Sequence, residues 1–162
     1  MPDTCSIIIQ SPLGLIELTA TNDRLVSIRI MPAETAVVTD DAPLLREAGA
    51  QLAAWFEGRL RIFDLPLEPL SSPRGELLRA AIAAIPYGDS LSYGAVARTI
   101  GSGPRAIGQA CRRNPFPIVI PCHRVIGSAG SIGYYSGGEG IVTKLWLLNH
   151  ESRQAKGSKW AG

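Results

Sequence analysis

Cys122 and His123 have the side chains best suited to nucleophilic chemistry, and they follow one another directly in the sequence. A thiol with a pKa of about 8.5 is mostly protonated at neutral pH, so a reactive one needs a base or a cation beside it. The carboxylate of Glu151 lies near the end of the chain and is available to orient an imidazole. Because adjacent side chains of an extended segment point in opposite directions, we expect His123 to act on Cys122 through a water molecule. The alternative is that Cys122 is one of the many cysteines that serve as small buried hydrophobic residues.

The other cysteines, Cys5 and Cys111, form no CxxC pair with Cys122 or with each other. With an odd number of cysteines we do not expect a disulfide framework. A zinc site would have to combine the two histidines, His123 and His150, with residues scattered along the chain. We therefore expect no metal site.

The composition is that of a soluble globular protein, with 46% hydrophobic and 19% charged residues in 162. No apolar run reaches the roughly 18 residues that a membrane span requires. The N-terminus shows no basic segment followed by an apolar one, so we expect no secretory signal and a cytoplasmic location.

Charge is distributed unevenly between the two halves of the chain. Residues 1–71 contain five basic and ten acidic side chains, a net charge of −5, whereas residues 72–162 contain eleven and four, a net charge of +7. This asymmetry suggests that the second half faces a polyanion such as DNA. A solvated basic surface without a partner is the alternative that charge alone leaves open.

The first half is predicted to form three strands and a helix. Ile, Leu, Val and Thr dominate Thr4–Gln10, Leu13–Ala20 and Arg24–Ile30, which favours an antiparallel meander. A helix is predicted to begin at Pro43, because apolar residues then recur at helical spacing, and Gly58 stands where that helix would end.

The proline-rich segment Leu65–Pro73 has no periodicity and is interpreted as a linker between two domains. Ser72 and Pro73 are typical of a helix N-cap and its first position. The helix that follows is expected to stop before Pro86. Its predicted buried residues are Leu77, Leu78, Ala81, Ile82 and Ile85.

Two short helices with a glycine-containing turn predict a helix-turn-helix. The first, Tyr93–Ile100, is capped by Ser92 and ends at Gly101, and the second is Arg105–Arg112. One face of the second helix carries the small residues Ala106, Gly108 and Ala110. Small residues allow close approach to a DNA groove, and the flanking arginines would contact phosphates or enter the base stack. Ordinary helix packing through small residues is the competing interpretation.

The last third is predicted to contain a strand, a loop and a helix. Ile118–Ile120 is interpreted as a short buried strand that ends against Cys122, and the glycine-rich stretch Gly127–Gly140 as a loop or wing. The final helix, Ile141–Glu151, is expected to pack through Ile141, Leu145 and Leu148.

Several segments of the second half together resemble the O6-alkylguanine-DNA alkyltransferases, or methylated-DNA–protein-cysteine methyltransferases. They are the PCHRV segment 121–125, RAIG at 105–108, Asn114-Pro115, YYSGG at 134–138, LLNHE at 147–151 and Ser92-Tyr93-Gly94. The resemblance covers nearly all of 73–152, and the combination at these separations is highly specific. It implies an α+β protein, with a ribonuclease H-like domain at 1–71 and a winged helix-turn-helix domain at 72–162.

The resemblance also implies a reaction. Cys122 would accept an alkyl group from O6-alkylguanine, and from O4-alkylthymine, in double-stranded DNA. His123 would take its proton through water, and Glu151 would orient His123. Because no side chain would hydrolyse the resulting thioether, each molecule would act once, without a cofactor and as a monomer.

Further positions receive roles in the same way. Tyr93 would donate a proton to the leaving guanine or crowd the phosphate, and Arg105 would fill the gap left by the extruded base. The expected DNA contacts are Tyr93, Arg105, Ala106, Gly108 and Arg112. The expected pocket comprises Asn114, which would hold the turn before the active site, the backbones of Val125 and Ser136, and the Tyr135 side chain. Tyr93 as a core aromatic, Asn114 as a helix terminator and Ser136 as a loop hydroxyl are the plainer alternatives.

Three other functions remain open at this point. A non-catalytic relative that only binds damaged DNA would carry another residue in place of Cys122. A Cys–His hydrolase would need an oxyanion hole and would turn over repeatedly. A winged-helix regulator would bind DNA without any chemistry.

Overall fold

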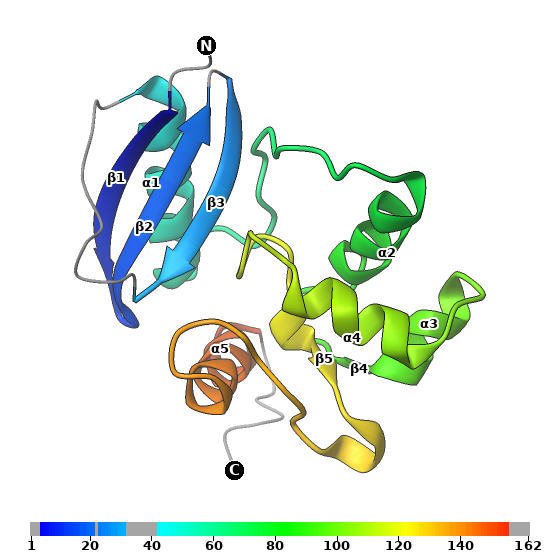
Figure 1. Cartoon of the computed structure of the whole chain (residues 1–162). Coiled ribbons are helices and arrows are strands. Elements are labelled where there is room, and N and C mark those ends of the chain that lie inside the picture. Colours follow the sequence, from blue (N-terminus) through cyan, green and yellow to red (C-terminus); the bar gives the residue numbers. More distant parts are fainter. Residues whose placement is uncertain (1–3, 22, 32–41, 156–162) are drawn as a thin grey trace. The chain divides into compact units, whose positions relative to one another are not determined.

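The computed structural model describes residues 4–21, 23–31 and 42–155 (Figure 1). The chain divides into two compact units, Met1–Glu68 and Pro69–Gly162. The division falls inside the predicted linker Leu65–Pro73. None of the helices in the described ranges is both long enough and apolar enough to cross a membrane.

The first unit contains a three-stranded antiparallel sheet. Its strands β1 (Thr4–Ser11), β2 (Gly14–Thr21) and β3 (Arg24–Ile30) are ordered β1-β2-β3, as expected for a meander. The predicted bounds are within one residue of those observed. Ile16 of the central strand is fully buried and pairs with Ile30 on β3, so the alternation of the strands directs apolar side chains into the core.

Helix α1 (Pro43–Phe56) packs against one face of this sheet (Figure 1). Its buried side chains recur at helical spacing and are Leu45, Ala48, Leu52 and Trp55. Gly58 has a φ of +79°, so the predicted glycine does terminate the helix in the left-handed region. The first half of the linker is fixed to the sheet, because Leu25 N donates to the Pro66 carbonyl and Glu68 N donates to the Leu25 carbonyl, both at 2.8 Å.

The second unit begins with helix α2 (Pro73–Ala83), whose predicted cap is confirmed. The Ser72 hydroxyl accepts a hydrogen bond from Gly75 N at 3.0 Å. Leu78 and Ile82 are buried, but Leu77 is 44% exposed, so its predicted burial is wrong. Fewer residues of this helix are buried than its apolar residues suggested.

Helices α3 (Tyr93–Thr99) and α4 (Pro104–Arg112) form the predicted helix-turn-helix. Ser92 caps α3 by accepting a hydrogen bond from Ala95 N at 3.0 Å. Strand β4 (Leu91–Ser92) precedes α3 and pairs in parallel with β5 (Val125–Ile126). This short pair ties the start of the helix-turn-helix to the segment that follows Cys122.

Ile118–Ile120 is not a strand, which corrects the sequence-based prediction. These residues form turns in which Ile120 N donates to the Phe116 carbonyl at 2.9 Å and Ile118 has a φ of +76°. Cys122–Arg124 then forms one turn of 3-10 helix rather than an extended segment. The expectation that Cys122 and His123 stand on an extended segment is therefore wrong.

A loop over residues 127–140, with a single 3-10 turn at Ser128–Gly130, leads into helix α5 (Ile141–Gln154). The packing face of α5 differs from the predicted one, because Ile141 and Leu145 are exposed. Its buried residues are Thr143, Lys144, Leu147, Leu148, His150, Glu151 and Ser152. Polar residues occupy this face because other parts of the unit supply their hydrogen-bond partners, which an apolar periodicity does not reveal.

Candidate active site

Cys122 lies at the first position of the 3-10 helix and is only 5% exposed. Its backbone N donates to the Ile120 carbonyl at 2.8 Å. The Asn114 side chain donates from Nδ2 to the same carbonyl at 3.0 Å and to Cys122 Sγ at 3.3 Å, while its Oδ1 accepts from Phe116 N. Asn114 therefore closes the turn between α4 and Cys122 and also places an amide donor on the sulfur.

The pKa of the Cys122 thiol is raised well above its ordinary value, first by its hydrogen bond with the Cys111 thiol and then by burial. The Asn114 hydrogen bond and the charge of Lys144 act in the opposite direction. The sequence had suggested that a histidine relay keeps this thiol ionised. The thiol is instead protonated at neutral pH, because the Cys111 hydrogen bond and burial both oppose its ionisation.

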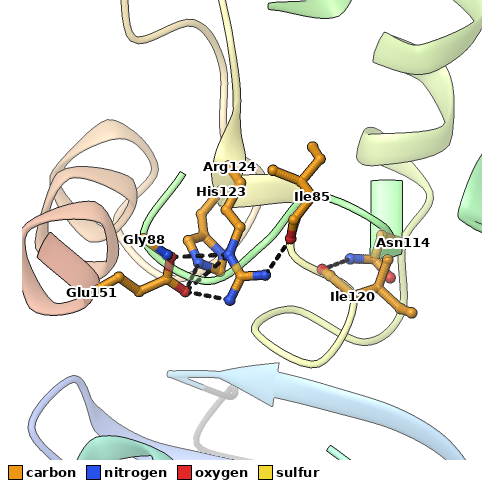
Figure 2. A network of polar contacts seen from close by, with 7 residues as sticks. All are labelled: Ile85, Gly88, Asn114, Ile120, His123, Arg124 and Glu151. Carbon is orange, nitrogen blue, oxygen red and sulfur yellow. Dashed lines mark hydrogen bonds and ion pairs between the residues drawn. The ribbon is translucent and has the colours of Figure 1, made fainter. Parts of the chain in front are cut away.

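His123 and Glu151 form a buried pair, as predicted, with Nε2 of the imidazole 2.7 Å from Oε2 of the carboxylate (Figure 2). Burial lowers the pKa of His123 against the opposing effect of Glu151, so the ring is neutral at pH 7. Burial would raise the pKa of Glu151, but His123 and Arg124 lower it to about 2. An ionised carboxylate at Nε2 selects the tautomer with its proton there, which makes Nδ1 the basic nitrogen.

Arg124 forms the other half of this network, and the sequence had given it no role. Its guanidinium contacts both oxygens of Glu151 at 2.7–3.1 Å and donates from Nη1 to the Ile85 carbonyl at 2.7 Å (Figure 2). Gly88 N donates to Oε1 of Glu151 at 3.2 Å, and the Tyr87 ring lies 5.5 Å from the guanidinium carbon. The carboxylate is thus held by three residues, His123, Arg124 and Gly88, so it orients His123 without moving itself. The position of Arg124 within the PCHRV segment was the available signal.

Lys144 is a second residue that sequence reasoning missed, and it is fully buried. Its ammonium donates to the carbonyls of Val125 at 2.6 Å and Tyr134 at 3.1 Å, which links β5 to the loop. Burial lowers its pKa to about 8, against the effect of the nearby thiols. Gly133 has a φ of +81°, and a Cβ there would lie 3.4 Å from Nζ and 3.3 Å from the Tyr93 ring. The loop passes this close to Lys144 because it has a glycine at this point.

Two tyrosines stand near the thiols. The pKa of Tyr93 is raised by burial and by both cysteines, although a hydrogen bond with the backbone of Tyr134 lowers it. Tyr135 is buried, and burial followed by the charges of Cys122 and Cys111 raises its pKa far above the usual value. Both phenols are therefore protonated at neutral pH and are able to donate hydrogen bonds. Ser136, by contrast, is exposed on the loop.

Helix α4 presents two different faces to solvent. A hollow of about 410 Å³ is lined by Arg105, Gly108, Gln109 and Arg112. The Arg112 guanidinium also stacks on the Tyr134 ring, 5.2 Å from its centroid. Ala106, instead, lines a separate cavity of about 430 Å³ between α2 and α4 together with Ala110 and Asn114. The predicted small-residue face is therefore divided, with Gly108 on the arginine side.

Comparison with known proteins finds a matching family model for each of the two units. The sequence model described as "6-O-methylguanine DNA methyltransferase, DNA binding domain" matches residues 76–153, and the model for the ribonuclease-like domain of the same proteins matches residues 6–69. The chain belongs to the 6-O-methylguanine DNA methyltransferase family. The predicted family and the predicted α+β fold class are thus confirmed.

Individual members of the 6-O-methylguanine DNA methyltransferase family resemble the chain over most of its length. The methylated-DNA–protein-cysteine methyltransferase of Methanosarcina acetivorans is 36% identical over 89% of this chain and 96% of that protein. The Homo sapiens protein of the same name is 34% identical over 90% of this chain and 79% of its own length. The crystal structure of Mycobacterium tuberculosis OGT in complex with DNA superimposes with a TM-score of 0.80 at 36% identity, covering 91% of this chain and 92% of that one.

Proposed function

We propose that this protein repairs alkylated DNA by transferring the alkyl group of O6-alkylguanine, and of O4-alkylthymine, to Sγ of Cys122. The observation that carries this proposal is the buried His123–Glu151 pair directly beside a cysteine, in a domain that also bears a helix-turn-helix. Membership of a family whose members are named methylated-DNA–protein-cysteine methyltransferases supports the same reaction.

DNA binding is assigned to the helix-turn-helix, with α4 in the groove. The hollow lined by Arg105 and Arg112 gives phosphates a positive surface, and Gly108 allows close backbone approach. The alkylated base lies inside the duplex, so it must be extruded at a cost of a few kcal/mol. Arg105 enters the gap and offsets that cost, while Ala106 supports the helix from the α2 side.

The proton of Cys122 leaves through water to Nδ1 of His123, since Nε2 is committed to Glu151. The thiolate formed is stabilised by the Asn114 amide and by the charge of Lys144. Its sulfur attacks the alkyl carbon while the bond from that carbon to O6 breaks, and Tyr93 supplies a proton to the departing guanine. The product is a thioether and an unmodified base.

The extruded base is placed between the loop and β5. The backbones of Val125 and Ser136 and the side chain of Tyr135 line this position, and Asn114 sets its distance from the sulfur. Because the thioether has no route back to a thiol, each monomer acts once and needs no cofactor. Undamaged guanine does not react, because it carries no alkyl carbon on O6 for the sulfur to attack.

The test is to incubate the protein with a duplex containing one O6-methylguanine and to measure the intact mass. We expect a gain of one methyl group per chain, located on the peptide containing Cys122. The Cys122→Ala variant is expected to bind the duplex without gaining mass, while Cys5→Ala, which removes a cysteine of the first unit, is expected to react normally. Binding without mass gain in the wild type would support a damage sensor or regulator, and repeated turnover would support a hydrolase.

A further inference from the structure

The loop over residues 127–140 is joined to helix α4 by a contact between two exposed side chains. The guanidinium carbon of Arg112, in the last turn of α4, lies 5.2 Å from the centroid of the Tyr134 ring, and Tyr134 is 54% exposed. Arg112 also lines the hollow of α4 that is assigned to DNA above. Tyr134 directly precedes Tyr135 and Ser136, which are assigned to the base pocket. The Arg112–Tyr134 pair therefore connects the DNA-binding helix with the loop of the pocket.

The backbone of Tyr134 is held from the opposite direction, by a buried residue. The Lys144 ammonium donates to the Tyr134 carbonyl at 3.1 Å and to the Val125 carbonyl at 2.6 Å. Val125 is the residue that ends the 3-10 helix beginning at Cys122. Contacts thus run from Arg112 on the surface, through Tyr134 and Lys144, to the segment that carries the acceptor cysteine.

The chemistry of the Arg112–Tyr134 pair leaves the arginine able to bind a phosphate at the same time. A guanidinium above an aromatic face keeps its N–H groups available at its edges. None of the ion pairs in the described part of the chain involves Arg112. A DNA phosphate bound to these N–H groups would bring the duplex over the pair and exclude water from it. Because a cation–π contact is stronger when desolvated than when exposed, the pair is stronger with DNA bound.

We propose that the Arg112–Tyr134 pair couples DNA binding to the position of the loop, with Tyr134 as a positioning residue. This rests on the proposed function, in which α4 binds the duplex and the loop lines the base pocket. Binding of a phosphate to Arg112 strengthens its hold on the Tyr134 ring and so restrains Tyr135 and Ser136. Since coupling between two binding events is reciprocal, the ring also strengthens the contact of Arg112 with DNA. The strengthening of the pair on desolvation corresponds to about fivefold in affinity.

The first experiment measures the dissociation constant of an undamaged duplex by fluorescence anisotropy, using the full chain. Tyr134→Leu keeps apolar bulk but has no ring face, and should weaken binding about fivefold. Tyr134→Phe keeps the ring face and should bind like the wild type. In an Arg112→Gln background, Tyr134→Leu should cause no further loss, because the two residues act as a pair. An equal loss in both backgrounds, or no loss in either, would overturn the coupling.

The second experiment follows amide hydrogen exchange of residues 131–138 with and without the same duplex. DNA should slow this exchange about fivefold more in the wild type and in Tyr134→Phe than in Tyr134→Leu. If Tyr134→Leu changed the exchange by the same factor with and without DNA, Tyr134 would have a packing role alone, and the coupling would be refuted.

Neither measurement requires alkyl transfer, so the two proposals fail separately. DNA-dependent protection of the loop in a protein that never gains a methyl group would support the coupling and refute the repair function. A protein that gains a methyl group while DNA leaves its loop exchange unchanged would refute the coupling and leave the repair function standing.

Discussion

Nε2 of His123 lies 2.7 Å from Oε2 of Glu151, and both side chains are almost completely buried. A neutral imidazole beside an ionised carboxylate has a fixed tautomer, in which Nε2 carries the proton and Nδ1 is the basic nitrogen. Burial is the main reason that His123 is neutral, and the charge of Arg124 acts in the same direction while it also lowers the pKa of Glu151. The protonation states of His123 and Glu151 therefore depend in part on Arg124.

The first prediction concerns stability in acid. Because the pKa of Glu151 is lowered to about 2 from its ordinary 4.5, the carboxylate stabilises the fold above pH 4.5, and this stability is lost as the pH falls through the interval to 2. The full effect is on the order of 3 kcal/mol. Glu151→Gln should lose stability at neutral pH and show a flatter pH dependence. Urea unfolding at pH 7 and pH 3 measures the free energy of unfolding of both proteins. If it fell by the same amount between the two pH values in Glu151→Gln as in the wild type, the prediction would be contradicted.

The second prediction concerns base extrusion. Arg105→Ala should slow repair of duplex DNA by about 10- to 100-fold, since extrusion costs a few kcal/mol that the arginine offsets. Reaction with free O6-methylguanine base should change little, because no base has to be extruded. Arg24→Ala, an exposed arginine of β3, is the matched control. Equal losses on both substrates would refute the role of Arg105.

The third prediction concerns the charge of α4. Raising the salt concentration should weaken duplex binding steeply, because arginines that neutralise phosphates release counterions. Arg112→Gln should reduce the slope of log K against log salt by about one, whereas Arg24→Gln should leave it unchanged. Fluorescence anisotropy with an undamaged duplex measures the slope. An unchanged slope in Arg112→Gln would remove this residue from the DNA-binding surface.

The fourth prediction concerns the buried lysine. Lys144→Met leaves the carbonyls of Val125 and Tyr134 without their donor, which should cost on the order of 2 kcal/mol in the free energy of unfolding. Amide hydrogen exchange should also accelerate in the loop around Tyr134. Arg153→Met, an exposed residue of the same helix, is the control. Unchanged exchange in Lys144→Met would show that the loop is held by other contacts.

Local rules made much of the fold predictable from the sequence. The strands alternate, Ser72 and Ser92 cap their helices, and Gly58 ends α1, because each of these features depends on a few neighbouring residues. The proposed acceptor cysteine and its partners belong to short motifs whose members the fold brings together. His123 and Glu151, 28 positions apart, form the predicted pair.

By itself, the sequence determined the secondary structure that local propensity controls and the residue types needed for thiol chemistry. The tertiary structure decided that Ile118–Ile120 forms turns instead of a strand, and that Lys144 and Arg124 are buried. It also placed a second thiol, Cys111, against Cys122. The reason is physical: a charged or polar side chain becomes a core residue only where distant segments supply its hydrogen-bond partners, and those partners are defined by packing rather than by any neighbour in the chain.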